Sequence, residues 1–108
     1  YLAMGDAKTA LDYYHRAIAR NPRSERSYNN VAVVHLYQGK YDDAIAMAQK
    51  ALSIFPNLGE AYIVMGRAYA LKGMRDDARR AFNTAREVDP PKAALVEAEL
   101  KALEGGTR

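Results

Sequence analysis

The chain has 108 residues, of which 49% are hydrophobic and 27% charged, and it contains no cysteine. The lack of cysteine excludes disulfide bonds, thiolate metal sites and cysteine nucleophiles. With 16 basic and 13 acidic residues the formal net charge is +3, which we interpret as a mild excess spread along the chain, too diffuse to indicate nucleic-acid binding.

A fixed interval of 34 residues separates three prolines and three glycines, namely Pro22, Pro56 and Pro90, and Gly5, Gly39 and Gly73. Two alanine series keep the same interval, namely Ala10, Ala44 and Ala78, and Ala17, Ala51 and Ala85. Such a period predicts stacked helical pairs, because one unit cannot bury its own apolar face and must pack on the next. The chain starts at Tyr1, in the middle of a unit, so we expect it to be a piece of a longer protein.

Taken in chain order, the apolar periodicity predicts six helices, at about residues 6–20, 25–38, 41–54, 59–72, 75–88 and 92–104. Each periodic glycine is expected to end the first helix of a pair, since glycine adopts the left-handed cap conformation without a steric penalty. Only Tyr1 to Met4 would remain of the leading helix of the first pair. Each proline is expected to close a second helix, because it disfavours helical geometry in the preceding residue. The predicted fold class is all-α.

Apolar stripes at i, i+4 and i+7 mark the contact face of each second helix: Ala10, Tyr14 and Ala17; Ala44, Ala48 and Ala51; and Ala78, Phe82 and Ala85. The matching stripes on the first helices are Tyr28, Val31, Ala32 and His35, and Tyr62, Met65, Gly66 and Tyr69. The small residues Ala32 and Gly66 are expected to let the paired backbones approach each other.

This series resembles the tetratricopeptide repeat, whose aromatic, Leu-Gly, Tyr, Ala, Phe, Ala, Pro pattern is matched by Tyr62, Met65–Gly66, Tyr69, Ala78, Phe82, Ala85 and Pro90. The resemblance implies a right-handed superhelical stack of antiparallel helix pairs. It divides the chain into a truncated first repeat over 1–24, a second over 25–58, a third over 59–92, and a capping helix and tail over 93–108.

The second repeat departs from the family pattern at His35, where tyrosine is usual, and at Ala48, where its neighbours have Tyr14 and Phe82. We expect a thinner layer there unless Met47 or Phe55 fills it. After Pro90 the pattern fades. Leu95, Leu100 and Leu103, interspersed with charged residues, predict an amphipathic helix that ends at Gly105–Gly106 and caps the last apolar face.

Catalysis finds little support in the sequence. The two histidines, His15 and His35, lie on different predicted helices, and no metalloprotease, phosphate-loop or serine-nucleophile motif is present. We interpret His35 as a half-buried histidine that replaces tyrosine, and His15 as a surface residue. The acidic pairs Asp42–Asp43 and Asp76–Asp77 open second helices, where negative charge complements the helix dipole. We predict no enzyme, no cofactor and no metal.

The face of each first helix that points away from its partner is the candidate binding site. It is neither polar nor fully covered, and part of its apolar surface is expected to be taken up by the neighbouring repeat. In this family the inner helices form a groove for a peptide or helix, in which apolar contacts give affinity and Asn and Arg side chains bind backbone or carboxylate groups. The candidate groove residues are Arg26, Asn29, Asn30, Val33, Leu36, Tyr37, Glu60, Ile63, Val64, Arg67 and Leu71.

Groove residues that differ from the binding patterns of known family members narrow the class of partner that this chain could bind. Asn30 matches an asparagine of the clamp that grips acidic chaperone tails, but Glu60 and Val64 occupy the basic positions of that clamp on the next repeat. The chain also lacks the asparagine ladder that certain sugar-transfer enzymes have along their repeats, because the counterpart of Asn30 in the next repeat is Val64. The groove suits an amphipathic or extended protein segment with a few acidic groups.

We therefore predict a non-catalytic protein-interaction module that binds a protein or peptide. The alternatives are a structural spacer or self-assembly element of a longer array, and a docking arm for a catalytic domain outside this segment. On the truncated first repeat, the apolar residues Leu11, Tyr14, Ala17 and Ile18 lack their partner helix, so we also expect a possible homodimer through this end.

No run approaches the roughly 18 apolar residues of a membrane span, and no basic-then-apolar leader is visible, so we expect a soluble chain. A composition without cysteine is compatible with a cytoplasmic or a bacterial periplasmic location.

Overall fold

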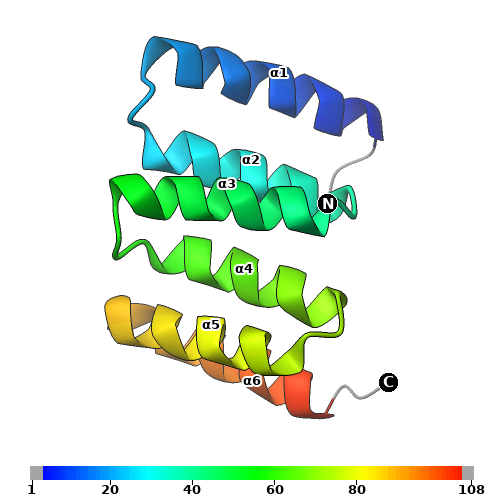
Figure 1. Ribbon diagram of the computed structural model, residues 1–108, viewed down its shortest axis with the longest axis vertical. Helices are drawn as coiled ribbons and strands as arrows, with labels where there is room; N and C mark the ends of the chain where they lie inside the picture. Colours follow the sequence, from blue (N-terminus) through cyan, green and yellow to red (C-terminus); the bar gives the residue numbers. More distant parts are fainter. Residues whose placement is uncertain (1–3, 106–108) are drawn as a thin grey trace.

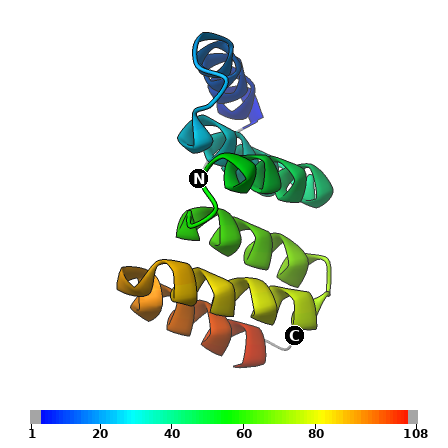
Figure 2. The ribbon, with the colours of Figure 1, turned by 60° about the vertical axis from the view of Figure 1, so that its left-hand side comes forward.

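The computed structural model of this chain describes residues 4–105, and these form one stack of helices (Figure 1). In order along the chain the elements are α1 (Met4–Arg20), α2 (Glu25–Tyr37), α3 (Tyr41–Ile54), α4 (Gly59–Leu71), α5 (Arg75–Val88), the short 3-10 helix η1 (Pro90–Lys92) and α6 (Ala93–Gly105). The described residues contain no strand. The molecule measures 40 × 28 × 20 Å, with α1 at one end of the long axis and α6 beside α5 at the other (Figure 2).

Helix ends follow the periodic glycines and prolines. Gly39 and Gly73 have φ angles of 79° and 82°, the left-handed conformation that glycine adopts most readily. Helices α1, α3 and α5 each end at the second residue before a periodic proline. The turns that contain these prolines therefore all lie along one edge of the stack (Figure 1).

The expectation for Gly5 was wrong. Helix α1 begins at Met4 and runs through Gly5, whereas we expected Met4 to belong to a leading helix that ends there. No preceding helix lies against α1 among residues 4–105, so nothing there requires a turn, and a glycine inside a helix costs only about 1 kcal/mol. The remainder of the expected leading helix, residues 1–3, lies outside the described residues.

The alanine stripes form the core between paired helices, as predicted. Ala44, Ala48 and Ala51 on α3 are completely buried against α2, and Ala78, Phe82 and Ala85 on α5 are buried against α4. Gly66 is required by this packing, because a Cβ atom at this position would lie 2.5 Å from Cε1 of Phe82. On α1 the equivalent residues Ala10, Tyr14 and Ala17 are only half-buried.

The two irregular positions of the second repeat are accommodated differently. His35 is half-buried, as predicted, and its Nδ1 lies 3.1 Å from Oε1 of Gln38. Next to Ala48, Met47 packs against the core, whereas Phe55 stays exposed. Of the two candidates, only the methionine, with its flexible side chain, therefore packs against this core.

Helix α6 caps the stack in a register that differs from the prediction at one residue. Val96 is fully buried, with Leu100 and Leu103 packed beside it, whereas Leu95 is 44% exposed. The short helix η1 precedes α6, and the stripe at positions 96, 100 and 103 is the one that meets the core around Phe82. Leu95 thus lies on a neighbouring face.

None of the helices within residues 4–105 combines the length and apolar character needed to cross a bilayer.

Candidate protein-binding groove

Helices α2, α4 and α6 together line the predicted groove, and two hollows lie along it. The first, here the Tyr37 hollow, has a volume of about 330 Å³ and is lined by Leu36, Tyr37, Arg67, Ala70, Leu71, Phe82, Glu99 and Leu103. The second, here the Asn29 hollow, has a volume of about 180 Å³ and is lined by Asn29, Val33, Glu60, Ile63, Val64, Arg67, Lys92 and Leu95. All predicted groove residues except Arg26 and Asn30 line one of the two hollows.

Burial divides the predicted groove residues into a floor and a rim. Leu36, Ile63 and Val64 are buried and belong to the core clusters, so the neighbouring repeat does take up part of this surface, as expected. Tyr37 and Leu71, which occupy equivalent positions 34 residues apart, are 56% and 60% exposed. These two side chains are the large exposed apolar groups of the Tyr37 hollow.

The charged groove residues are paired within the chain. Arg67 donates through Nε to Oε2 of Glu99 at 2.7 Å, and its Nη2 bonds the same oxygen. Nζ of Lys92 lies 3.5 Å from Oε2 of Glu60. Both pairs tie α4 to the chain after Pro90. We expected Arg67 to bind a carboxylate of the partner, and a partner would have to displace Glu99 to do so.

Asn29 is the one polar residue buried in the groove floor. Its side chain is 9% exposed, and its Oδ1 has no hydrogen-bond partner among the described residues. A buried acceptor without a partner costs about 1–3 kcal/mol relative to a satisfied one. The Asn29 hollow therefore contains an amide that an N–H group or a water molecule would stabilise.

Sequence reasoning missed the contribution of η1 and α6 to this site, namely Lys92 on η1 and Leu95, Glu99 and Leu103 on α6. The spacing of Leu95, Glu99 and Leu103 at i, i+4 and i+8 was a readable signal that they share a face. Which helix that face meets depends on how α6 packs on α5, and the repeat pattern stops before α6.

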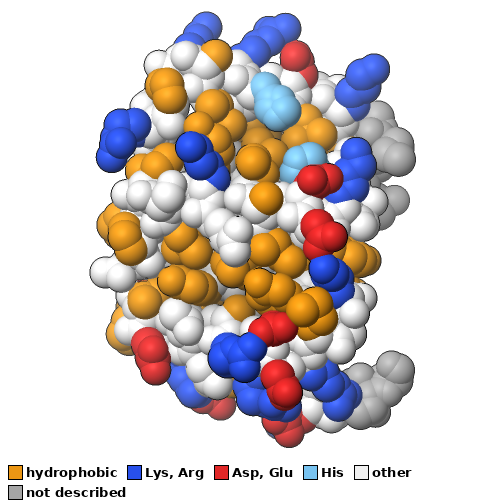
Figure 3. Space-filling view, in the orientation of Figure 1, with side chains coloured by type: hydrophobic (Ala, Val, Ile, Leu, Met, Phe, Trp, Pro, Cys, Tyr) orange, Lys and Arg blue, Asp and Glu red, His pale blue; other side chains and the backbone are white. Residues whose placement is uncertain are grey.

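In the part of the chain that the structure describes, no three histidine, cysteine, aspartate or glutamate side chains are placed to hold a metal ion. Asp42 and Asp43 lie in the first turn of α3, and Asp76 and Asp77 in that of α5, as the helix-dipole interpretation predicts. On the face shown in Figure 3, hydrophobic side chains gather over α1 to α4, and charged ones lie over α5 and α6, along the right-hand side and at the top edge over α1.

Comparison with known proteins agrees with this architecture. A family model described as tetratricopeptide repeat matches residues 1–57 and 23–90, which together cover most of the chain. The chain belongs to the tetratricopeptide repeat family. Members of this family are generally non-catalytic protein-interaction modules.

Among curated relatives, this tetratricopeptide repeat chain is 34% identical to small glutamine-rich tetratricopeptide repeat-containing protein 2 of Mycosarcoma maydis, over 83% of this chain and 26% of that protein. It is 32% identical to tetratricopeptide repeat protein 36 of Bos taurus, over 81% of this chain and 48% of that protein. The chain thus spans about a quarter to a half of these relatives.

Solved structures show the same fold. MamA superimposes with a TM-score of 0.73 and 36% identity, over 82% of this chain and 52% of that one. The TPR2B domain of yeast Sti1, solved as a complex with pHsp70, superimposes with a TM-score of 0.86 and 24% identity, over 94% of this chain and 86% of that one.

Proposed function

We propose that the groove of α2, α4 and α6 binds a segment of another protein, with apolar side chains of that segment seated in the Tyr37 hollow. The observation that carries the proposal is the exposure of Tyr37 and Leu71 over a hollow whose other walls are largely apolar. Large exposed apolar residues that cluster on a concave surface are typical of protein-binding sites.

The polar groups of the groove favour an apolar or amphipathic segment over a strongly acidic one. Arg67 is already neutralised by Glu99, and Lys92 lies beside Glu60, so little free positive charge remains in the two hollows. The structurally similar TPR2B domain of Sti1 was solved with pHsp70. In this chain, however, Glu60 and Val64 stand where the clamp for acidic chaperone tails has basic residues.

The experiment starts from peptides selected from a random phage-displayed library against the parent chain. The affinity of a selected, fluorescently labelled peptide is then measured by anisotropy for the parent and for Tyr37→Ala with Leu71→Ala. Because each anchor at the centre of an interface can be worth about 2 kcal/mol or more, we expect the double variant to bind at least tenfold more weakly. Arg67 is left intact, since replacing it would also break its pair with Glu99.

The matched control is Phe55→Ala with Met74→Ala, which removes two exposed apolar side chains outside the groove. It should bind the peptide as well as the parent does. Equal binding by the groove variant and the parent would rule out the groove as the site. Failure to select any peptide would favour the alternatives, a structural spacer or a docking arm of an enzyme.

A further inference from the structure

The positive charge of this chain is concentrated at one place, contrary to our expectation that it is spread along the sequence. Residues 16–26 contain four arginines and one glutamate, a net charge of +3, which equals the charge of the whole chain. The rest of the chain has 12 basic residues (16 less 4) and 12 acidic residues (13 less 1), so its charges balance. These residues form the last turns of α1, the connecting turn and the start of α2.

The arginines of this stretch are exposed and mostly without acidic partners. Arg16 forms a 3.2 Å pair with Asp12 on the surface, a kind of pair worth only about 0–1 kcal/mol. Within residues 4–105, Arg20, Arg23 and Arg26 form no ion pair. By contrast, four of the five described arginines outside this stretch, at positions 67, 79, 80 and 86, have a carboxylate partner, and only Arg75 has none within residues 4–105.

Three of these arginines do not recur with the repeat. One repeat later, the counterparts of Arg20, Arg23 and Arg26 are Ile54, Asn57 and Glu60, whereas that of Arg16 is the basic residue Lys50. A residue needed for the fold of every repeat would recur at the 34-residue interval, as the core alanines do. The arginine cluster is therefore specific to the α1–α2 junction, and the helix pairing itself does not explain it.

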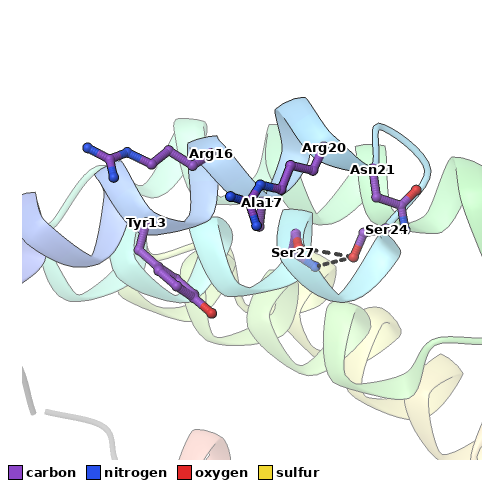
Figure 4. Close-up of a pocket in the computed structure, with 7 residues that line it drawn as sticks. All are labelled: Tyr13, Arg16, Ala17, Arg20, Asn21, Ser24 and Ser27. Carbon is purple, nitrogen blue, oxygen red and sulfur yellow. Dashed lines mark hydrogen bonds between the residues drawn. The ribbon is translucent and has the colours of Figure 1, made fainter.

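An open hollow of about 350 Å³, whose lining includes two arginines, an asparagine and two serines, lies at the same junction. Figure 4 shows Tyr13, Arg16, Ala17 and Arg20 on α1 above Ser24 and Ser27 at the start of α2, with Asn21 in the turn. At the equivalent junction between α3 and α4, the positions of Ser24 and Ser27 are occupied by the buried residues Leu58 and Ala61. The first junction thus replaces apolar packing with hydrogen-bonding groups.

The hydrogen-bond donors around this hollow suit carboxylate oxygens. Guanidinium groups form charge-assisted hydrogen bonds to carboxylates, roughly twice as strong as bonds between neutral groups. The hydroxyl of Ser24 is engaged with Ser27, to whose Oγ it donates at 3.0 Å, while Oδ1 of Asn21 accepts from the backbone N–H of Arg23 at 3.2 Å. The hydroxyl of Ser27 and the amide NH₂ of Asn21 remain available to donate to an anion.

We propose that this junction, defined by Arg16, Arg20, Arg23, Arg26, Asn21 and Ser27, binds an acidic segment of a partner protein. It is a second site, separate from the two hollows of the proposed groove. A nucleic acid fits less well, because its phosphates demand an extended basic track. The next turn along the same edge, residues 55–58, carries no charge, and the third contains Asp89 and Lys92. The positive surface is one turn wide.

The test measures binding of fluorescein-labelled hexaglutamate to the full chain by anisotropy, at about 50 mM and about 150 mM NaCl, since screening weakens such contacts. Arg20→Gln with Arg23→Gln should bind about tenfold more weakly than the parent or worse. The matched control, Arg79→Gln with Arg80→Gln, removes the same charge from α5 and should bind as the parent does. Circular dichroism should be unchanged in both variants, since all four side chains lie on the surface.

Three results would overturn the proposal. The first is no binding of hexaglutamate by the parent, or an equal loss in the α5 control, which would mean attraction by net charge alone. The second is tighter binding of a labelled hexathymidine oligonucleotide than of hexaglutamate, which would make this a nucleic-acid surface. The third is loss of hexaglutamate binding in Tyr37→Ala with Leu71→Ala, which would place the acidic segment in the groove instead.

Discussion

Gly66 and Phe82 show how a single pair of residues sets the spacing between α4 and α5. The equivalent pair one repeat earlier is Ala32 and Ala48. The third repeat thus pairs a glycine with a large aromatic ring, whereas the second repeat pairs two alanines. All four positions are buried. At the contact between α4 and α5, the missing side chain at position 66 makes room for the ring of Phe82.

We predict that Gly66→Ala lowers the free energy of unfolding by about 1–3 kcal/mol, because its Cβ would overlap the ring of Phe82. In Gly66→Ala with Phe82→Leu the smaller side chain makes room for the methyl group. Urea denaturation of the two single variants and the double variant should therefore give a coupling energy above about 0.5 kcal/mol. Strict additivity of the two changes would contradict the contact.

At the scale of elements, local signals decided most of what the sequence could predict. Glycine and proline determine the ends of α2 to α5 through their own backbone preferences, so those bounds were predictable to within one residue. The start of α1 and the register of α6 were not predictable in this way, because both depend on packing against neighbouring helices. For the same reason the residues of α2 and α4 that line the two hollows were predictable, with the exception that the pairing of Arg67 with Glu99 was not.

The register of α6 can be tested with two neighbouring residues. Val96→Ala should destabilise the chain by about 1–3 kcal/mol, because it leaves a cavity at a fully buried position. Leu95→Ala should change stability by less than about 0.5 kcal/mol, since this side chain is half-exposed on the groove face. Urea denaturation curves of both variants measure the difference. The reverse order would mean that α6 is rotated and that Leu95 faces the core.

At the scale of the whole molecule, α1 forms one end of the described stack with its apolar stripe incompletely covered. Leu11, Tyr14, Ala17 and Ile18 are each only half-buried, whereas the counterparts of Tyr14 and Ala17 are buried on both later helices, namely Ala48, Ala51, Phe82 and Ala85. A neighbouring surface could cover this stripe, and a second copy of the chain supplies one through a two-fold contact.

We therefore propose that the chain self-associates through α1. Multi-angle light scattering at several concentrations should show a mass that rises from monomer to dimer. Tyr14→Glu should restore the monomer by placing a charge in the contact. A monomer mass at every concentration would rule out self-association, and a dimer that persists in Tyr14→Glu would place the interface elsewhere.

The central claim is that the groove of α2, α4 and α6 is the surface on which this tetratricopeptide repeat chain binds its protein partner. The most direct test is a titration of the uniformly ¹⁵N-labelled chain with a library-selected peptide, followed by amide chemical shifts. The account predicts that shifts concentrate at Tyr37, Leu71 and Leu103 and along the groove faces of their helices, while the outward faces of α3 and α5 stay unchanged. Shifts concentrated on α3 and α5, with the groove amides unmoved, would contradict it.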